Sequence, residues 1–245
     1  MRIVGKVVRF AAASVVVCGL SSAVHAQEKT TITMDGSTTV GPIAKAFAEH
    51  YAQQNPNVNI TVGESGSGNG AKSLINGTCD IASMSRFFKE SEFKAAAEKG
   101  VMPVAHVVAL DGLAMIVHPS NPVRALTSKQ IHDIYAGRIA NWRQVGGPDA
   151  KIVVISRDTN SGTYETFKDI VMKDAKIVDS AEYVGSNGQA RARVQNTRGA
   201  IAFVGLGFVD RTVKALPVDG IAPSEATVAS GKYPNISYSF GSWAS

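Results

Sequence analysis

Short apolar stretches alternate along the chain with longer stretches in which apolar residues recur at helical spacing. The short stretches, typical of strands, cover residues 30–34, 58–62, 80–84, 152–155 and 200–203. The stretches typical of helices cover residues 40–54, 71–76, 89–99, 128–136, 164–172 and about 187–196. Strands that alternate with helices predict an α/β fold with mainly parallel sheets.

Three features refine this plan. The first predicted helix carries Ile43, Phe47 and Tyr51 on one face, which is the expected core side. The apolar run 104–117 is long for one strand and is predicted to carry the chain from one lobe to another. Residues 217–245 form a weakly patterned tail.

Residues 1–26 have the pattern of a secretory signal peptide. Basic residues come first, an apolar centre follows at residues 10–20, and small residues precede Gln27. The apolar centre is too short to span a bilayer as a helix. We therefore predict a cleaved, exported product, with an uncleaved membrane anchor as the alternative.

Composition narrows the function further. The sequence contains 25 basic and 20 acidic residues, and residues 1–26 hold three of the basic ones and no acidic ones. The remainder is nearly neutral and has no run of Lys or Arg, so nucleic-acid binding is not predicted. Cys79 is the one cysteine beyond residue 26 and is expected to be a small buried hydrophobe. The five His are scattered, and no metal site or cofactor is predicted.

The most informative turn covers residues 157–163 (RDTNSGT), between a predicted strand and a predicted helix. A helix N-terminus presents unpaired N–H groups and the positive end of the helix dipole. Gly162 lets a ligand approach the backbone, and Ser161 and Thr163 add hydroxyl donors. Arg157 adds a positive charge. This combination predicts a site for a small oxyanion, and the alternative is an ordinary capped helix beside a surface arginine.

Further turns have similar chemistry. They are residues 36–39 (GSTT), 66–70 (GSGNG) and 83–86 (SMSR), each at the end of a predicted strand. In open α/β sheets, ligands bind at the carboxyl ends of strands. We therefore expect these turns and residues 157–163 to converge on one site.

In combination, these motifs resemble those of the periplasmic phosphate-binding proteins of bacterial phosphate ABC transporters, within the type 2 periplasmic-binding-protein superfamily. The resemblance runs from about residue 31 to 234 and includes residues 36–42 (GSTTVGP), 67–70 (SGNG), 85–86 (SR), 135–142 (YAGRIANW), 157–163 and 199–204 (GAIAFV). It implies two lobes, each a mainly parallel sheet flanked by helices, with the ligand in the cleft between them. The implied division is a signal peptide at 1–26, a first lobe at 27–110, a second lobe at 111–205 and a return segment to the first lobe at 206–245.

The same resemblance implies a set of phosphate-binding residues. These are Thr38, Thr39, Ser67, Ser85, Arg157, Ser161, Gly162 and Thr163. Ser37 either caps its own helix or contacts the ligand. Arg86 either contributes a salt link or lies at the rim of the cleft, and Asn187 is a secondary candidate.

The chain departs from the family pattern in two places. Some members have an aspartate at the position of Ser85, and its carboxylate accepts the proton of HPO₄²⁻ and so rejects sulfate. Asp111 is our candidate for this acceptor, with a structural role in an Asp-Gly turn as the alternative. Family members continue after residue 234 through a strand and a last helix, whereas residues 235–245 are interpreted as a divergent or truncated end.

The function implied by the resemblance is capture of inorganic phosphate by a periplasmic monomer, with delivery to the permease and ATPase subunits of an ABC importer. Two alternatives remain: a binding protein for sulfate, molybdate or tungstate, and a phosphate sensor without a transport role. An enzyme is not predicted. The residues around Ser161 lack the Gly-x-Ser-x-Gly pattern of nucleophilic serines, and no histidine occurs in a recognisable base motif.

Overall fold

The structure, a computed structural model, describes residues 30–173, 175–234 and 237–244. Its strands are β1 (Thr30–Gly36), β2 (Val58–Val62), β3 (Ile81–Met84), β4 (Val104–Val117), β5 (Val153–Arg157), β6 (Glu182–Val184), β7 (Ala200–Gly205), β8 (Lys214–Leu216) and β9 (Ser237–Ala244). Its α-helices are α1 (Gly41–Gln54), α2 (Ser67–Ile75), α3 (Glu90–Glu98), α4 (Ser128–Tyr135), α5 (Gly162–Phe167), α6 (Asn187–Gln195) and α7 (Glu225–Ala229). Other helical turns are η1 (Trp142–Val145), η2 (Lys168–Met172) and η3 (Leu206–Phe208). The predicted signal peptide, residues 1–26, lies outside the described residues.

The strands form one nine-stranded sheet in the order β2-β1-β3-β9-β4-β7-β5-β6, with β8 paired to β4. β1 runs parallel to β2 and β3, and β5 runs parallel to β6 and β7. β4 and β9 are antiparallel to their neighbours. The predicted α/β architecture, with mainly parallel strands in each half, is confirmed.

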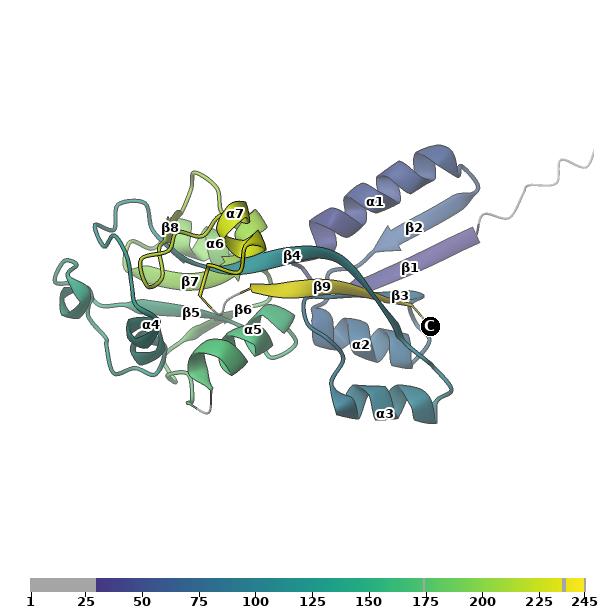
Figure 1. Cartoon of the computed structure of the whole chain (residues 1–245), viewed down its shortest axis with the longest axis horizontal. Helices are drawn as coiled ribbons and strands as arrows, with labels where there is room; N and C mark the ends of the chain where they lie inside the picture. The colour runs from purple at the N-terminus through teal and green to yellow at the C-terminus, as the bar shows by residue number, and fades with distance from the viewer. Residues whose placement is uncertain (1–29, 174, 235–236, 245) are drawn as a thin grey trace, which may run out of the picture.

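The sheet is shared between two lobes, which β4 and β9 connect (Figure 1). We call β1–β3 with α1–α3 the first lobe, and β5–β8 with α4–α7 the second lobe. β4 pairs with β9 as far as Gly112 and with β7 from Leu113 onward. The predicted crossing of residues 104–117 between lobes is therefore confirmed.

Helices cover both faces of the first lobe's strands, with α1 on one side and α2 and α3 on the other (Figure 1). The α2–α3 side holds a small core in which Leu74, Met84 and Ala96 are fully or almost fully buried. This core fixes α2 against the end of β3, where two of the polar turns meet.

The second lobe has the larger core, and three rings at its centre hold α5 in place. Phe167 of α5 stacks on Phe203 of β7, with ring centroids 4.1 Å apart and planes 7° apart. Tyr135 of α4 packs on Phe167 at 4.5 Å and donates a hydrogen bond from its hydroxyl to the Ile155 carbonyl, 3.1 Å away. Because all three side chains are buried, they position α5 and β5, the two elements that carry residues 157–163.

The C-terminal part of the chain contains more regular structure than its pattern suggests. β8 pairs with β4, and Val228 and Tyr233 are buried in the second lobe's core. β9 alone inserts between β3 and β4. We therefore propose a division in which only β9 returns to the first lobe, in place of the whole predicted segment 206–245, and we keep the lobe boundary near residues 110 and 111 as a proposal.

Two helices differ in detail from the prediction. α1 buries Ala44 and Ala48, whereas Phe47 and Tyr51 are 57% and 46% exposed. The buried face is therefore rotated by one residue, because small residues let the helix lie close to the strands. α2 begins at Ser67, four residues before the predicted start, since Gly66 takes φ 101°, a left-handed conformation that favours glycine just before a helix.

Cys79 is buried, as predicted, and burial raises the pKa of its thiol to about 11. Across the described part of the chain, no helix combines the length and the apolar character needed to cross a membrane.

Candidate functional site

The polar turns at residues 36–39 and 157–163 meet between the lobes. The hydroxyl oxygens of Thr39 and Thr163 lie 3.0 Å apart, and Arg157 donates from Nη2 to the Thr38 hydroxyl at 3.3 Å. The predicted convergence of these two turns is confirmed. The seven predicted residues that carry side chains are each at most 7% exposed: Thr38, Thr39, Ser67, Ser85, Arg157, Ser161 and Thr163.

The other two turns meet at the same place. The Ser67 hydroxyl accepts a hydrogen bond from the Ser85 backbone at 3.1 Å, and the two serine hydroxyls lie 3.2 Å apart. Gly162, the first residue of α5, faces this pair: a Cβ added to it would lie 2.5 Å from each serine Oγ. The backbone N–H of Gly68 also donates to the Asn160 carbonyl at 2.9 Å, so the lobes are in direct contact here.

Arg157 ends β5, and its guanidinium is fixed from several sides. Its Nε donates to the Val184 carbonyl at 3.2 Å, and its Nη2 donates to the Gly185 carbonyl at 2.9 Å. The residue is only 2% exposed. These bonds to the end of β6 hold the side chain in one orientation and fix a buried positive charge at the polar turns.

Helix N-termini surround the same point. α2 begins at Ser67 and α5 begins at Gly162, so both present early backbone N–H groups there. Ser161 caps α5 by accepting from the Tyr164 backbone at 3.2 Å, which leaves its O–H available as a donor. The predicted N-terminus of the helix after β5 is confirmed.

Asn187, named only as a secondary candidate by the sequence, lies in the centre of this cluster. It is fully buried and donates from Nδ2 to the Thr39 hydroxyl at 2.8 Å and to the Thr38 hydroxyl at 3.2 Å. Its Oδ1 accepts from the Gly205 backbone at 3.2 Å. The signal in the sequence was the same as for the other turns, a serine followed by a helix start, but Asn187 is remote in sequence from the threonines that it contacts.

Charged residues form an ion-pair cluster between the lobes. Arg86 Nε lies 2.6 Å from Glu165 Oε2, and Lys89 Nζ lies 3.0 Å from Glu165 Oε1. Arg86 also donates to both carboxylate oxygens of Glu92. Burial of Glu92 opposes its ionisation, yet the hydrogen bonds from Arg86 and from the Lys89 backbone keep its pKa below the usual value. Of the two interpretations of Arg86, the salt link is the one observed.

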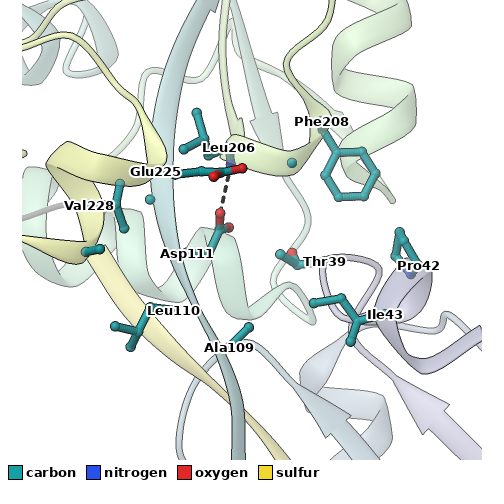
Figure 2. A pocket seen from close by; sticks show the side chains of 13 residues that line it. Thr39, Pro42, Ile43, Ala109, Leu110, Asp111, Leu206, Phe208, Glu225 and Val228 are labelled. Carbon is teal, nitrogen blue, oxygen red and sulfur yellow. Dashed lines mark hydrogen bonds between the residues drawn. The ribbon is translucent and has the colours of Figure 1, made fainter. Parts of the chain in front are cut away.

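Ser37 and Asp111 have structural contacts. The Ser37 hydroxyl accepts from the backbone N–H groups of Thr39 and Val40, at 3.1 and 3.4 Å, and so stabilises the turn that precedes α1. Asp111 is buried and accepts from the Leu206 backbone at 2.9 Å. It lines a cavity of about 380 Å³ between α1, β4, η3 and α7, beside Thr39 (Figure 2).

The position of Asp111 relative to Thr39 matters for its predicted role. A Cβ built on Gly205 would lie 2.5 Å from Asp111 Oδ2 and 3.0 Å from the Thr39 methyl carbon. The carboxylate and the Thr39 methyl group thus both lie close to Gly205, and the Thr39 hydroxyl lies 3.0 Å from the Thr163 hydroxyl. The role of Asp111 as a proton acceptor stays a prediction.

The cluster is rich in hydrogen-bond donors. It combines hydroxyl groups, helix N-termini and one guanidinium, all of which stabilise negative charge. Within the part of the chain that the structure describes, no group of three or more His, Cys, Asp or Glu side chains is arranged to hold a metal ion. The chemistry that these residues support is binding of a small oxyanion.

Comparisons with known proteins agree with this chemistry. The family model described as a PBP superfamily domain matches residues 21–241. Protein SphX of Synechococcus elongatus is 34% identical over 221 residues, which cover 84% of this chain and 65% of the relative. The phosphate-binding protein PstS of Bacillus subtilis is 32% identical over 208 residues, which cover 84% of this chain and 68% of the relative. The chain thus spans about two thirds of the length of these relatives.

A solved structure is also similar over most of both chains. It is described as that of a candidate phosphate ABC transporter substrate-binding protein from Clostridium perfringens with bound phosphate. The two chains are 34% identical, superpose with a TM-score of 0.83, and the match covers 88% of this chain and 86% of the other.

Proposed function

The chain belongs to the PBP superfamily and, within it, to the family of PstS-like phosphate-binding proteins, and from this premise we propose that it captures inorganic phosphate between its lobes and delivers it to an ABC importer. The observation that carries the proposal is the buried cluster of donors around Arg157. Thr38 of the first lobe contacts this guanidinium, and Thr39 beside it lies 3.0 Å from Thr163 of the second lobe.

We assign the ligand contacts to the residues that the sequence indicated. They are Thr38, Thr39, Ser67, Ser85, Arg157, Ser161, Gly162 and Thr163. The Gly162 backbone and most of the hydroxyls would donate to phosphate oxygens, and in the pairs Thr39–Thr163 and Ser67–Ser85 one hydroxyl can donate to the other. Arg157 would supply the charge-assisted bonds, which are about twice as strong as neutral ones. Closure of the lobes around the anion removes water from these bonds and strengthens them.

The wider role follows from the same premise. We propose a binding protein without catalytic activity that works outside the cytoplasm, in the periplasm, as a monomer. Its partners would be the permease and ATPase subunits of the importer. The similarity to proteins named for phosphate binding and phosphate ABC transport supports this role.

Isothermal titration calorimetry with phosphate, arsenate, sulfate and molybdate, at two pH values, tests the substrate. We expect phosphate to bind with a Kd near micromolar or tighter, about −8 kcal/mol or better. Arsenate, which has the same shape and protonation, should compete. Tighter binding of sulfate or molybdate than of phosphate would overturn the assignment.

Arg157 variants test the site. Arg157→Ala should weaken phosphate binding by roughly 3–5 kcal/mol, because the anion would then face neutral groups alone. Arg157→Lys should recover part of the loss, since it restores the charge without the planar fork. Arg143→Ala, at an exposed arginine of η1, is the matched control and should bind phosphate like the wild type. If Arg157→Ala binds phosphate like the wild type, the ligand lies elsewhere.

A further inference from the structure

The orientation of the Asn187 amide is fixed by its surroundings. Gly205 contributes a backbone N–H, which can only donate, so the atom that it faces must be the oxygen Oδ1. The nitrogen Nδ2 therefore faces the two threonine hydroxyls, at 2.8 and 3.2 Å. Each of its two hydrogens has one hydroxyl oxygen as its partner. Asn187 is thus a donor to Thr39 and Thr38, never an acceptor from them.

The donor role of the Asn187 amide restricts the hydrogen bonds that the Thr38 hydroxyl can make. A hydroxyl oxygen has two lone pairs and one hydrogen. Thr38 Oγ1 accepts from Asn187 Nδ2 at 3.2 Å and from Arg157 Nη2 at 3.3 Å, so both of its lone pairs are used. Its own hydrogen must then be donated to a third group. Thr39 Oγ1 likewise accepts from Asn187, and it also lies 3.0 Å from Thr163 Oγ1, where either hydroxyl can be the donor.

Resting on the proposed function, we propose that Asn187 is a positioning residue for the anion site: together with Arg157 it uses both lone pairs of the Thr38 hydroxyl, which makes this hydroxyl an obligatory donor toward phosphate, and it keeps the Thr39 hydrogen turned away from the amide. Without it, the Thr38 hydroxyl could rotate and present a lone pair to the anion, which would repel it. Asn187 acts through the threonines and needs no contact with phosphate itself.

The same contacts join the two lobes. Asn187 begins α6 in the second lobe, whereas Thr38 and Thr39 belong to the turn between β1 and α1 in the first. The amide meets the hydroxyls only when the lobes are together. The orientation of the hydroxyl donors is therefore coupled to closure of the lobes: the amide holds these hydroxyls in place only in the closed site.

A double-mutant cycle measured by phosphate titration calorimetry tests this inference. Asn187→Ala should weaken phosphate binding roughly 10- to 100-fold, because the Thr38 hydroxyl loses its fixed orientation as a donor. Thr38→Val removes the hydroxyl and keeps the shape. In the Thr38→Val background, the additional effect of Asn187→Ala should be smaller by about fivefold or more, since part of what Asn187 orients is already absent. Asn196→Ala, at the exposed end of the same helix, should bind like the wild type.

A second variant separates positioning from folding. Asn187→Asp keeps an acceptor for the Gly205 N–H but replaces the NH₂ group by an oxygen. We expect its thermal unfolding without phosphate to stay close to that of the wild type, while phosphate binding falls at least 100-fold, because the threonines would donate to the carboxylate and its charge would repel the anion.

Three outcomes decide the matter. Coupling between Asn187 and Thr38, with the unbound protein equally stable, supports the inference. Equal fold-losses for Asn187→Ala in both backgrounds, or wild-type binding by Asn187→Asp, overturn it and leave the proposed function intact. A wild-type chain that binds no phosphate overturns the proposed function, and this inference falls with it.

Discussion

Gly162 offers the sharpest test of how the lobes meet. It is the first residue of α5, and its backbone does not need the left-handed region that favours glycine. Alanine at this position should therefore suit the helix, and α5 should gain rather than lose stability, by about 0.5–1 kcal/mol. The added methyl group, however, points at the first lobe.

The structure gives the size of the clash. The new Cβ would lie 2.5 Å from Ser67 Oγ, 2.5 Å from Ser85 Oγ and 3.1 Å from Ser67 Cβ, whereas ordinary contacts begin at 3.4 Å. The hydroxyls would have to retreat by about 1 Å. Overpacking costs about 1–3 kcal/mol, and each displaced hydrogen bond costs about 0.5–1.5 kcal/mol. We expect phosphate binding to weaken by roughly 2–4 kcal/mol, or roughly 30- to 1,000-fold.

The assay pairs phosphate calorimetry with thermal unfolding of the unbound protein. Gly207→Ala is the matched control, because a Cβ at that position meets nothing within 4 Å. It should bind phosphate like the wild type. Gly162→Ala should lose affinity while its unfolding temperature without phosphate stays equal or rises.

Two results would refute this reasoning. Wild-type affinity in Gly162→Ala would mean that α5 does not approach Ser67 and Ser85 in the phosphate-bound state. A lower unfolding temperature of the unbound variant would mean that the methyl group disturbs the second lobe itself. The first result concerns closure and the second concerns folding, so the two measurements together separate them.

Two further predictions concern other parts of the molecule. Glu165→Gln should weaken phosphate binding roughly 5- to 30-fold, because Arg86 and Lys89 lose their charged partner across the lobes. Stopped-flow measurements should show the effect mainly as faster release of phosphate. Glu98→Gln, at the exposed end of α3, is the control, and equal release rates for the two variants would exclude a role for the ion pair. Burial raises the pKa of the Cys79 thiol to about 11, so Cys79 should resist iodoacetamide at pH 8 in the folded protein and react in urea. The neutral thiol contributes stability below the pKa of the unfolded state, near 9, and this contribution is lost as the pH rises toward 11. Rapid labelling of the native protein, measured by mass spectrometry, would contradict this prediction.

Much of the site could be predicted because its chemistry is local in sequence. Residues 157–163 contain the arginine, the cap and the glycine that one oxyanion site needs, and the strand before them and the helix after them follow from apolar spacing. The convergence with residues 36–39 followed from one general rule, that ligands bind at the carboxyl ends of parallel strands. The length of the apolar run 104–117 also indicated that it carries the chain between lobes, since no single lobe needs a strand of that length.

The parts that could not be predicted depend on contacts between distant segments. Phe47 and Tyr51 follow a helical period as well as Ala44 and Ala48 do, and only the close approach of α1 to the strands selects the smaller pair. β6 and β8 have three residues each, too few to show a period. The partners of Glu165 lie on a separate lobe, and no spacing along the chain connects them.

We propose that discrimination between phosphate and sulfate depends on which hydroxyls of this cluster can accept a proton. Sulfate carries no proton near neutral pH, so a site selects phosphate by offering one acceptor among its donors. Thr38 is committed as a donor, because Arg157 and Asn187 occupy its lone pairs. Asp111 accepts from the Leu206 backbone through Oδ1, and its role as the proton acceptor stays a prediction. The hydroxyls of Ser67 and Ser85 lie 3.2 Å apart, so one of them can donate its hydrogen to the other. The donating hydroxyl then keeps a lone pair that can accept the proton of phosphate. A neutral acceptor tolerates sulfate better than a carboxylate does. Selectivity for phosphate that depends on one of these serines would therefore rest on one hydrogen bond rather than on charge repulsion.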